Sequence, residues 1–240
     1  LFVGAVYVQS PIVPLDVPTE AEALHLVDRL GARADFYKVG LELYTRSGPR
    51  VVEALVERGK QVFLDLKLHD IPNTVGRAVA VASDLGVDLL TVHGSGGPGM
   101  LEAAVAHRTG GLRLLAVTVL TSMRPDEMGA VWGREIRSVR EEVGRIADLA
   151  RDADVDGVVA SALEASWLRS RVGPDFLIVT PGIRPAGAGS DDQSRIATPA
   201  DAVEAGADYL VIGRPITRAP DPPAALEAIL DEISRAEGSG

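Results

Sequence analysis

The chain has 240 residues and a formal charge of −10, from 34 acidic and 24 basic side chains. A chain of this length buries about 70–75% of its unfolded surface on folding, so its core needs no disulfide or metal. The absence of cysteine excludes disulfides, thiolate nucleophiles and zinc–cysteine sites. An acidic chain without basic runs also argues against binding to nucleic acid or to anionic membranes.

Residues 1–11 differ from the rest of the chain. They are mildly apolar, but they lack the basic residues that begin a signal peptide and are short for one. We expect 1–11 to be an extension, unstructured or foreign to the native protein, and 12–236 to form the catalytic domain. No apolar stretch approaches the roughly 20 residues that a membrane span requires. A cytoplasmic location is expected, because a chain without cysteine fits a reducing compartment.

Two kinds of segment alternate along the chain from residue 12 onward. Short β-branched runs that end in polar residues or glycine predict strands at Ile12–Leu15, Phe36–Val39, Val62–Leu66, Leu89–His93, Leu114–Thr118, Gly157–Ala160, Leu177–Thr180 and Tyr209–Ile212. Helical periodicity between them predicts helices at Thr19–Leu30, Pro49–Arg58, Asn73–Leu85, Gly99–His107, Val139–Arg151, Ala162–Ser170, Pro199–Glu204 and Pro223–Arg235.

This alternation predicts the fold. Strands separated by helices pair in parallel through helical crossovers. Eight such units in one chain of this length favour a closed (β/α)8 TIM barrel over an open doubly wound sheet. No linker or change in composition divides the chain, so we expect a single α/β domain.

In such a barrel the chemistry lies at the carboxyl ends of the strands. Several predicted strands end in charged or polar residues where a core strand would carry Val or Ile. Buried charges are tolerated only when they are paired, so these ends predict a functional site. They are Asp16, Lys38, Asp65 with Lys67, His93, Thr118, Ser161, Pro181-Gly182 and Gly213-Arg214.

The densest group of charges follows the third strand. Side chains alternate along a strand, so Asp65 and Lys67 are expected on one face with their Cα atoms about 6.5–7 Å apart. Asp70 lies beyond the strand, and Pro72 opens the next helix. The alternative is an amphipathic edge strand with solvated charges, because D-x-K-x-x-D arises by chance in about one chain of this size in twenty. Its position at a strand end, beside Lys38 at the second strand end, favours an active site.

At this point the sequence resembles a known family. D-L-K-L-H-D-I-P-N-T (65–74) is similar to the signature of orotidine 5′-phosphate decarboxylases of the shorter bacterial type. Other motifs of that family follow in order, at Leu15-Asp16, Lys38-Val39-Gly40, Leu120-Thr121-Ser122, Thr180-Pro181-Gly182-Ile183-Arg184, Asp192-Gln193 and Ile212-Gly213-Arg214-Pro215-Ile216. One departure is Pro14, where the family has a small residue. A proline lacks a ladder donor, so we expect an irregular first strand.

The resemblance implies decarboxylation of orotidine 5′-monophosphate to uridine 5′-monophosphate in de novo pyrimidine biosynthesis, with no cofactor and no metal. It implies that Lys67 stabilises and protonates the carbanion, that Asp65 lies near the substrate carboxylate, and that Lys38 and Asp70 complete an array of alternating charges. It further implies a homodimer in which Asp70 and Thr74 reach the active site of the neighbouring subunit.

The substrate-binding residues are expected on the later loops. By resemblance and by the phosphate-binding habit of such barrels, Pro181, Arg184, Gln193, Gly213 and Arg214 surround the phosphate, with the glycine-rich run 186–190 as a lid. Arg184 is alternatively a rim charge. Asp16 and Lys38 are expected to bond ribose hydroxyls, and either Thr121 or Ser122 the pyrimidine.

Two other functions compete with this reading. A magnesium-dependent sugar-phosphate decarboxylase or aldolase shares D-x-K-x-x-D, but those relatives have a metal-binding glutamate where this chain has Lys38. A non-catalytic phosphate-binding barrel is the other, and loss of one charge from the array would favour it; none is missing. His69 and His93 adjoin the site and are expected to bond the backbone rather than act as acid or base.

Overall fold

The structure is a computed structural model that describes residues 11–185 and 197–238. Residues 1–10, which make up most of the expected extension, the lid run 186–190 and Gln193 lie outside the described residues. The domain boundary at 11–12 therefore stays a prediction, although Pro11 itself is buried. Within the described residues, no helix is long and apolar enough to cross a membrane.

Eight parallel strands follow one another around the sheet in chain order, as the alternating pattern predicts. Ile12 closes the ring between the last strand and the first. Its N–H donates to the Leu210 carbonyl at 2.8 Å, and its carbonyl accepts the Ile212 N–H at 3.0 Å. The strands are β1 (Val13–Pro14), β2 (Phe36–Gly40), β3 (Gln61–Leu68), β4 (Leu89–His93), β5 (Arg113–Val117), β6 (Gly157–Val159), β7 (Leu177–Thr180) and β8 (Tyr209–Leu210).

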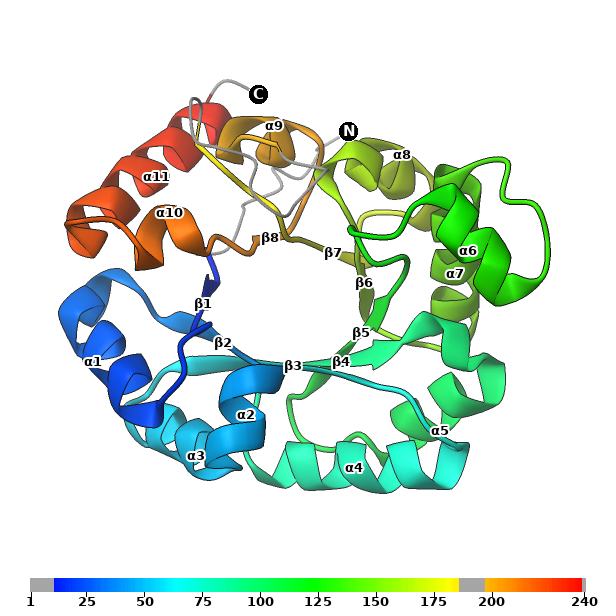
Figure 1. The fold of residues 1–240 in the computed structure, drawn as a ribbon, viewed down its shortest axis with the longest axis horizontal. Helices are drawn as coiled ribbons and strands as arrows, with labels where there is room; N and C mark the ends of the chain where they lie inside the picture. Colours follow the sequence, from blue (N-terminus) through cyan, green and yellow to red (C-terminus); the bar gives the residue numbers. More distant parts are fainter. Residues whose placement is uncertain (1–10, 186–196, 239–240) are drawn as a thin grey trace.

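Helices surround the strands in an outer ring (Figure 1). All eight predicted helices are present with ends shifted by at most two residues: α1 (Glu20–Leu30), α3 (Arg50–Glu57), α4 (Pro72–Asp84), α5 (Pro98–His107), α7 (Val139–Asp152), α8 (Ala162–Val172), α9 (Pro199–Glu204) and α11 (Pro222–Glu237). Side-chain caps fix several starts; the Thr19 hydroxyl, for example, accepts the Glu22 N–H. In the described part of the chain, three further helices that the sequence pattern did not indicate lie in the loops after strands: α2 (Leu41–Ser47), α6 (Pro125–Trp132) and α10 (Arg214–Thr217).

The core has two parts because side chains alternate along each strand. Inward-facing residues fill the barrel itself: Ile12, Phe36, Phe63, Leu89, Leu115, Val179, Tyr209 and Val211. Their neighbours on the strands pack outward against the apolar faces of the helices. Lys38, Asp65 and Thr91 each come two residues after one of the interior residues. They therefore form the next layer inside the barrel, toward the carboxyl ends of the strands.

A repeated aspartate closes the opposite end of the barrel. Asp88, Asp156 and Asp208 each immediately precede an even-numbered strand. The carboxylate of each accepts a backbone N–H from the strand before, at 2.8 Å from Val62, 2.7 Å from Leu114 and 2.6 Å from Ile178 respectively. Arginines also pair with two of them, Arg108 with Asp156 and Arg169 with Asp208. These pairs join neighbouring strands at their amino ends, away from the predicted site.

The first strand is as irregular as Pro14 predicts. Only Val13 and Pro14 are paired as strand residues, although Leu15 still donates its N–H to the Lys38 carbonyl at 2.9 Å. Pro14 packs beside Gly213, where an added Cβ would lie 3.0 Å from the proline Cγ. The irregularity leaves Asp16 beside Lys38, where the family motif predicts it.

Candidate active site

A cavity of 450 Å³ opens at the carboxyl ends of the strands. Nine of the thirteen predicted site residues line it: Asp16, Lys38, Asp65, Lys67, Thr121, Pro181, Arg184, Gly213 and Arg214. They come from β1, β2, β3, β5, β7 and β8 or the loops that follow them, so the closed barrel brings together residues far apart in sequence. The barrel mouth is therefore the candidate active site.

Four of these residues form a continuous row of alternating charges. The distances between charged atoms are 3.1 Å from Asp16 to Lys38, 3.7 Å from Lys38 to Asp65 and 2.7 Å from Asp65 to Lys67. The inner side chains, Lys38 and Asp65, are 12% and 13% exposed, whereas Lys67 is 32% and Asp16 65% exposed. Lys67 thus presents a fixed ammonium to the cavity. The alternative interpretation of 65–70 as an amphipathic edge strand with solvated charges is therefore wrong.

The electrostatics of Asp65 follow from this row. Burial by itself raises the pKa of Asp65, but the positive charges of Lys38 and Lys67 and the hydrogen bonds from Lys67 and Thr91 outweigh it. The pKa of Asp65 is consequently lower than usual, and its carboxylate stays ionised at neutral pH. A buried carboxylate between two ammonium groups holds both in place.

The chain reaches this arrangement through an irregular β3, not through regular alternation. Leu64 pairs with Leu90 and Leu68 with Val92, so Asp65, Leu66 and Lys67 lie opposite Thr91 alone. The backbone of Lys67 is left-handed, with φ of +50°. That conformation costs an ordinary residue about 1–2 kcal/mol and marks a functional position when the surrounding structure maintains it.

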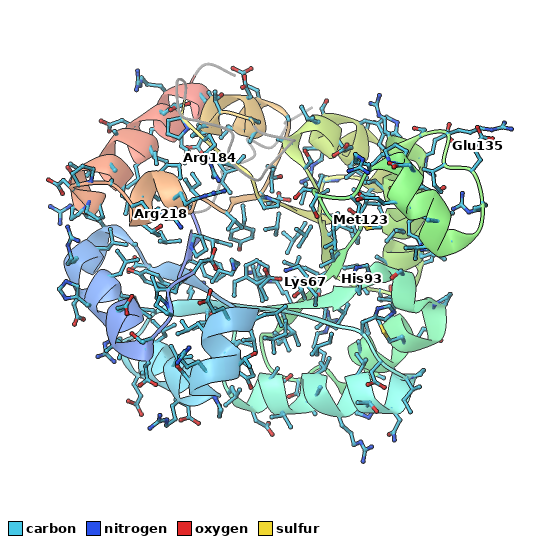
Figure 2. The ribbon with its side chains drawn as sticks, in the orientation of Figure 1. Lys67, His93, Met123, Glu135, Arg184 and Arg218 are labelled. Carbon is cyan, nitrogen blue, oxygen red and sulfur yellow. The ribbon has the colours of Figure 1, made fainter. Side chains whose placement is uncertain are left out.

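The other side of the cavity is rich in arginine. Figure 2 shows Arg184 and Arg218 near β8 and α10, across the barrel from Lys67 on β3 and His93 on β4. Arg184 is only 6% exposed and donates to the Ile183 carbonyl at 2.8 Å, so it is not a solvated rim charge. Arg184, Arg214 and Arg218 all line the cavity. Three guanidinium groups in one wall suit an anion with several oxygens, such as a phosphate.

Three predicted residues in the described part of the chain, Asp70, Thr74 and Ser122, do not line the cavity. Asp70 and Thr74 are exposed, and the Asp70 carboxylate accepts the N–H of Ile71 at 2.6 Å. Among the described residues Asp70 forms no ion pair, so within one chain Asp16, not Asp70, is the fourth charge of the row. Ser122 is exposed while its neighbour Thr121 lines the cavity. Gln193 falls outside the described residues.

Several residues of the site were missed from the sequence. Arg218 follows α10, which was not predicted, and Thr91 sits inside β4 with no charge to draw attention to it. Glu42 and Thr217 also line the cavity and belong to the unpredicted helices α2 and α10. Only their positions in the sequence could have indicated these residues. Glu42, Thr217 and Arg218 come shortly after strands that end in a predicted site residue, and Thr91 lies in β4, the strand next to β3.

The two histidines beside the site contact each other. The rings of His69 and His93 stack with centroids 5.2 Å apart and planes 18° from parallel. His93 Nδ1 accepts the Ser95 N–H at 3.4 Å and lies 2.7 Å from the Ser95 hydroxyl, in keeping with the expected backbone bond. Burial, together with the nearby charges of His69 and Lys67, lowers the pKa of His93. Its ring is therefore neutral at neutral pH.

The described residues hold no cluster of three or more His, Cys, Asp or Glu side chains suited to a metal ion. The place where metal-dependent relatives carry a glutamate is occupied by Lys38, whose ammonium is held between Asp16 and Asp65. A cation held there opposes the binding of a divalent ion.

Comparisons with known proteins agree on one family. The model of the orotidine 5′-phosphate decarboxylase / HUMPS family matches residues 10–229. Orotidine 5′-phosphate decarboxylase of Moorella thermoacetica is 52% identical over 92% of this chain and 91% of that protein, and that of Trichlorobacter lovleyi is 51% identical over 92% and 94%. The crystal structure of the Lactobacillus acidophilus orotidine 5′-phosphate decarboxylase superposes with a TM-score of 0.82 at 40% identity, covering 94% of this chain and 99% of that one.

Proposed function

The chain belongs to the orotidine 5′-phosphate decarboxylase / HUMPS family, and from that premise we propose how its side chains perform the reaction. It is a carboxy-lyase of pyrimidine biosynthesis that converts orotidine 5′-monophosphate to uridine 5′-monophosphate and carbon dioxide. The observation that carries the proposal is the row Asp16–Lys38–Asp65–Lys67, which ends in an ammonium inside the cavity.

Lys67 replaces the departing carboxylate with a proton. When carbon dioxide leaves, the electron pair stays on C6 in the plane of the pyrimidine, where the ring's π-system cannot delocalise it. A positive charge fixed beside C6 stabilises that pair, and the same ammonium then supplies the proton. The short contact with Asp65 holds the Lys67 ammonium in one position, so no reorganisation is needed when the charge develops.

Asp65 supports this step by repelling the substrate carboxylate. The ionised Asp65 faces the substrate carboxylate, and two unit charges 4 Å apart repel by about 4 kcal/mol at an effective dielectric of 20. This repulsion is relieved as carbon dioxide leaves, but it is small beside the roughly 20 kcal/mol of the largest enzymatic barrier reductions. The fixed ammonium of Lys67 therefore supplies much of the remaining rate enhancement.

The rest of the cavity binds the remainder of the nucleotide. Arg184 and Arg214 offer forked donors to the phosphate, Gly213 and Pro181 shape that end of the cavity, and Gln193 contacts the phosphate by resemblance. Asp16 and Lys38 bond the ribose hydroxyls. Thr121, which lines the cavity, takes the pyrimidine edge in preference to the exposed Ser122. These remote contacts orient C6 against Lys67.

The functional unit we propose is a homodimer in which Asp70 and Thr74 complete the partner's site. Both residues are exposed and do not line the cavity of their own chain, and the adjacent Ile71 is 66% exposed, as an interface residue would be in a single chain. A test is complementation between Lys67→Ala and Asp70→Asn chains. Mixed dimers would hold one intact site, so random mixing should restore about a quarter of wild-type activity; no restoration would contradict the shared site.

The activity is tested by following the ultraviolet absorbance of orotidine 5′-monophosphate in the presence of EDTA. The wild-type enzyme should consume it, and Lys67→Ala should abolish turnover. The chain has three lysines, and Lys60 provides the control because its ammonium bonds the Gly31 and Ala34 carbonyls away from the cavity. Lys60→Ala should retain kcat. An active Lys67→Ala enzyme would refute the role of Lys67, and dependence on a divalent ion would favour the metal-dependent relatives.

A cytoplasmic location accompanies this proposal. It is supported by the absence of cysteine and by the biosynthetic role of the family.

A further inference from the structure

The pairing of β3 with β4 is interrupted at the lysine that the proposed mechanism uses. Between the pairs Leu64–Leu90 and Leu68–Val92, three residues of β3 face the single residue Thr91. The regular register of the two strands is therefore broken at Lys67. Its left-handed backbone is a conformation that non-glycine residues keep only when their surroundings hold it.

The side chain of Thr91 supplies the missing contacts. Its hydroxyl oxygen accepts the Lys67 N–H at 2.8 Å, and its hydroxyl proton is donated to Asp65 Oδ1 at 2.9 Å. The same Asp65 oxygen accepts the Lys67 ammonium at 2.7 Å. Thr91 is fully buried and does not line the cavity. One hydroxyl thus joins the backbone of Lys67 to the carboxylate that holds its ammonium.

We propose that Thr91 is a positioning residue that fixes the ammonium of Lys67 against C6 of the substrate. The inference rests on the proposed function of Lys67. The Thr91 hydroxyl has two effects. It stabilises the left-handed backbone of Lys67, and it orients the Asp65 carboxylate that accepts a hydrogen bond from the Lys67 ammonium. Without it, the part-buried Lys67 N–H would lose this acceptor, and the strand would relax toward regular pairing.

A displacement of the ammonium should affect the chemical step more than binding. The phosphate and ribose contacts come from other strands, so KM depends little on the bulge in β3. The proton donor, in contrast, must stand close to C6, and misplacing a reacting group by about 1 Å costs up to 10²-fold in rate.

The experiment compares three variants. Thr91→Val keeps the shape and removes the hydroxyl, whereas Thr91→Ser keeps the hydroxyl. Thr118→Val is the matched control, because Thr118, although it is one of the predicted strand-end residues, does not line the cavity. It is also buried, and its hydroxyl donates to the Val159 carbonyl at 3.0 Å rather than to Asp65. We expect Thr91→Val to lower kcat about 10- to 100-fold with KM changed less than about threefold. Thr91→Ser should recover most of kcat, and Thr118→Val should keep kcat whatever its melting temperature.

The pH profile gives a second readout that a purely structural role would not move. Asp65 is faced by Lys38 from β2, by Lys67 from its own strand and by the Thr91 hydroxyl from β4. The hydrogen bond from Thr91 helps to keep the pKa of Asp65 low. Its loss raises that pKa, so the acid limb of kcat/KM should move to higher pH in Thr91→Val and stay in place in Thr118→Val.

Each outcome decides the question. A Thr91→Val enzyme with kcat within about twofold of wild type overturns the inference, as does a Thr91→Ser enzyme that loses as much as Thr91→Val. If Thr91→Val fails to fold, Thr91→Ala, which also removes the hydroxyl, takes its place, with the same expected loss of kcat and the same expected shift of the acid limb. Failure of the wild-type enzyme to consume orotidine 5′-monophosphate would instead refute the proposed function.

Discussion

Adding one methyl group at Gly40 should disturb the site while leaving the fold almost intact. Gly40 ends β2 and precedes α2 with φ of −98° and ψ of −178°, a conformation that alanine also adopts. A Cβ placed there would lie 2.9 Å from the Lys38 ammonium and 3.5 Å from an Asp16 carboxylate oxygen. The obstacle to Gly40→Ala is therefore the far end of a flexible lysine, which must move.

The structure sets the size of both effects. Asp16 is largely exposed, so weakening its bond to Lys38 costs about 0.2–1 kcal/mol. For a chain of this size that corresponds to a fall in melting temperature of at most about 4 °C. The catalytic cost is larger, because the shifted Lys38 no longer holds Asp65 as before. A misplacement approaching 1 Å predicts a loss of kcat/KM of about 10- to 100-fold.

The assay pairs turnover of orotidine 5′-monophosphate with a thermal melt. Gly99→Ala is the matched control, because Gly99 lies in the first turn of α5 and the nearest atom to an added Cβ is Pro72 Cγ at 4.0 Å. That substitution should leave kcat/KM unchanged and the melting temperature equal or slightly higher. If Gly40→Ala retains full kcat/KM, the position of the Lys38 ammonium does not matter and the reasoning fails.

Three further substitutions probe other parts of the molecule. Asp208→Ala removes the acceptor of the Ile178 N–H and the partner of Arg169, so it should destabilise by about 3 kcal/mol and lower the melting temperature by roughly 6–12 °C; kcat should not change. Arg218→Ala should raise KM about fivefold at low salt and less at high salt, with kcat preserved, if Arg218 attracts the phosphate. The pKa of His93 is lowered in the folded state, so the unfolded chain takes up its proton first and stability falls as pH drops below about 6.5. His93→Gln should reduce that fall, which urea unfolding at two pH values would measure; an unchanged slope would contradict it.

Much of the fold could be predicted from the sequence, because the apolar patterns that indicate strands and helices are local in the chain. The strand Leu177–Thr180 and the helix Pro199–Glu204 were placed to the residue. The three missed helices have eight residues or fewer, and they are too short to show a clear apolar stripe. Their positions depend on packing against other elements, as α10 packs on α11 and β1, and no local pattern encodes such contacts.

The candidate site was predicted less completely. Charges at strand ends identified Lys38, Asp65 and Lys67, and the structure brings them together. The reason given for Asp65 and Lys67, regular alternation, was wrong, because β3 bulges at that point and Lys67 is left-handed. A bulge is determined by how β3 pairs with β4, so the role of Thr91 could not be predicted from the sequence of β3 alone. Asp70 does not line the cavity of its own chain, and its predicted place in the site of a partner stays a prediction.

The join between the last strand and the first is the thinnest part of the barrel wall. β1 and β8 have two residues each, and Ile12 contributes the bonds that close the gap. In native-state hydrogen exchange this seam should therefore open before the longer β3 and β5. Asp16 follows β1 and Arg214 follows β8, so a nucleotide that contacts both would hold the two strands together. Substrate binding would then stabilise the closed barrel, because opening of the seam would separate the residues that bind the nucleotide.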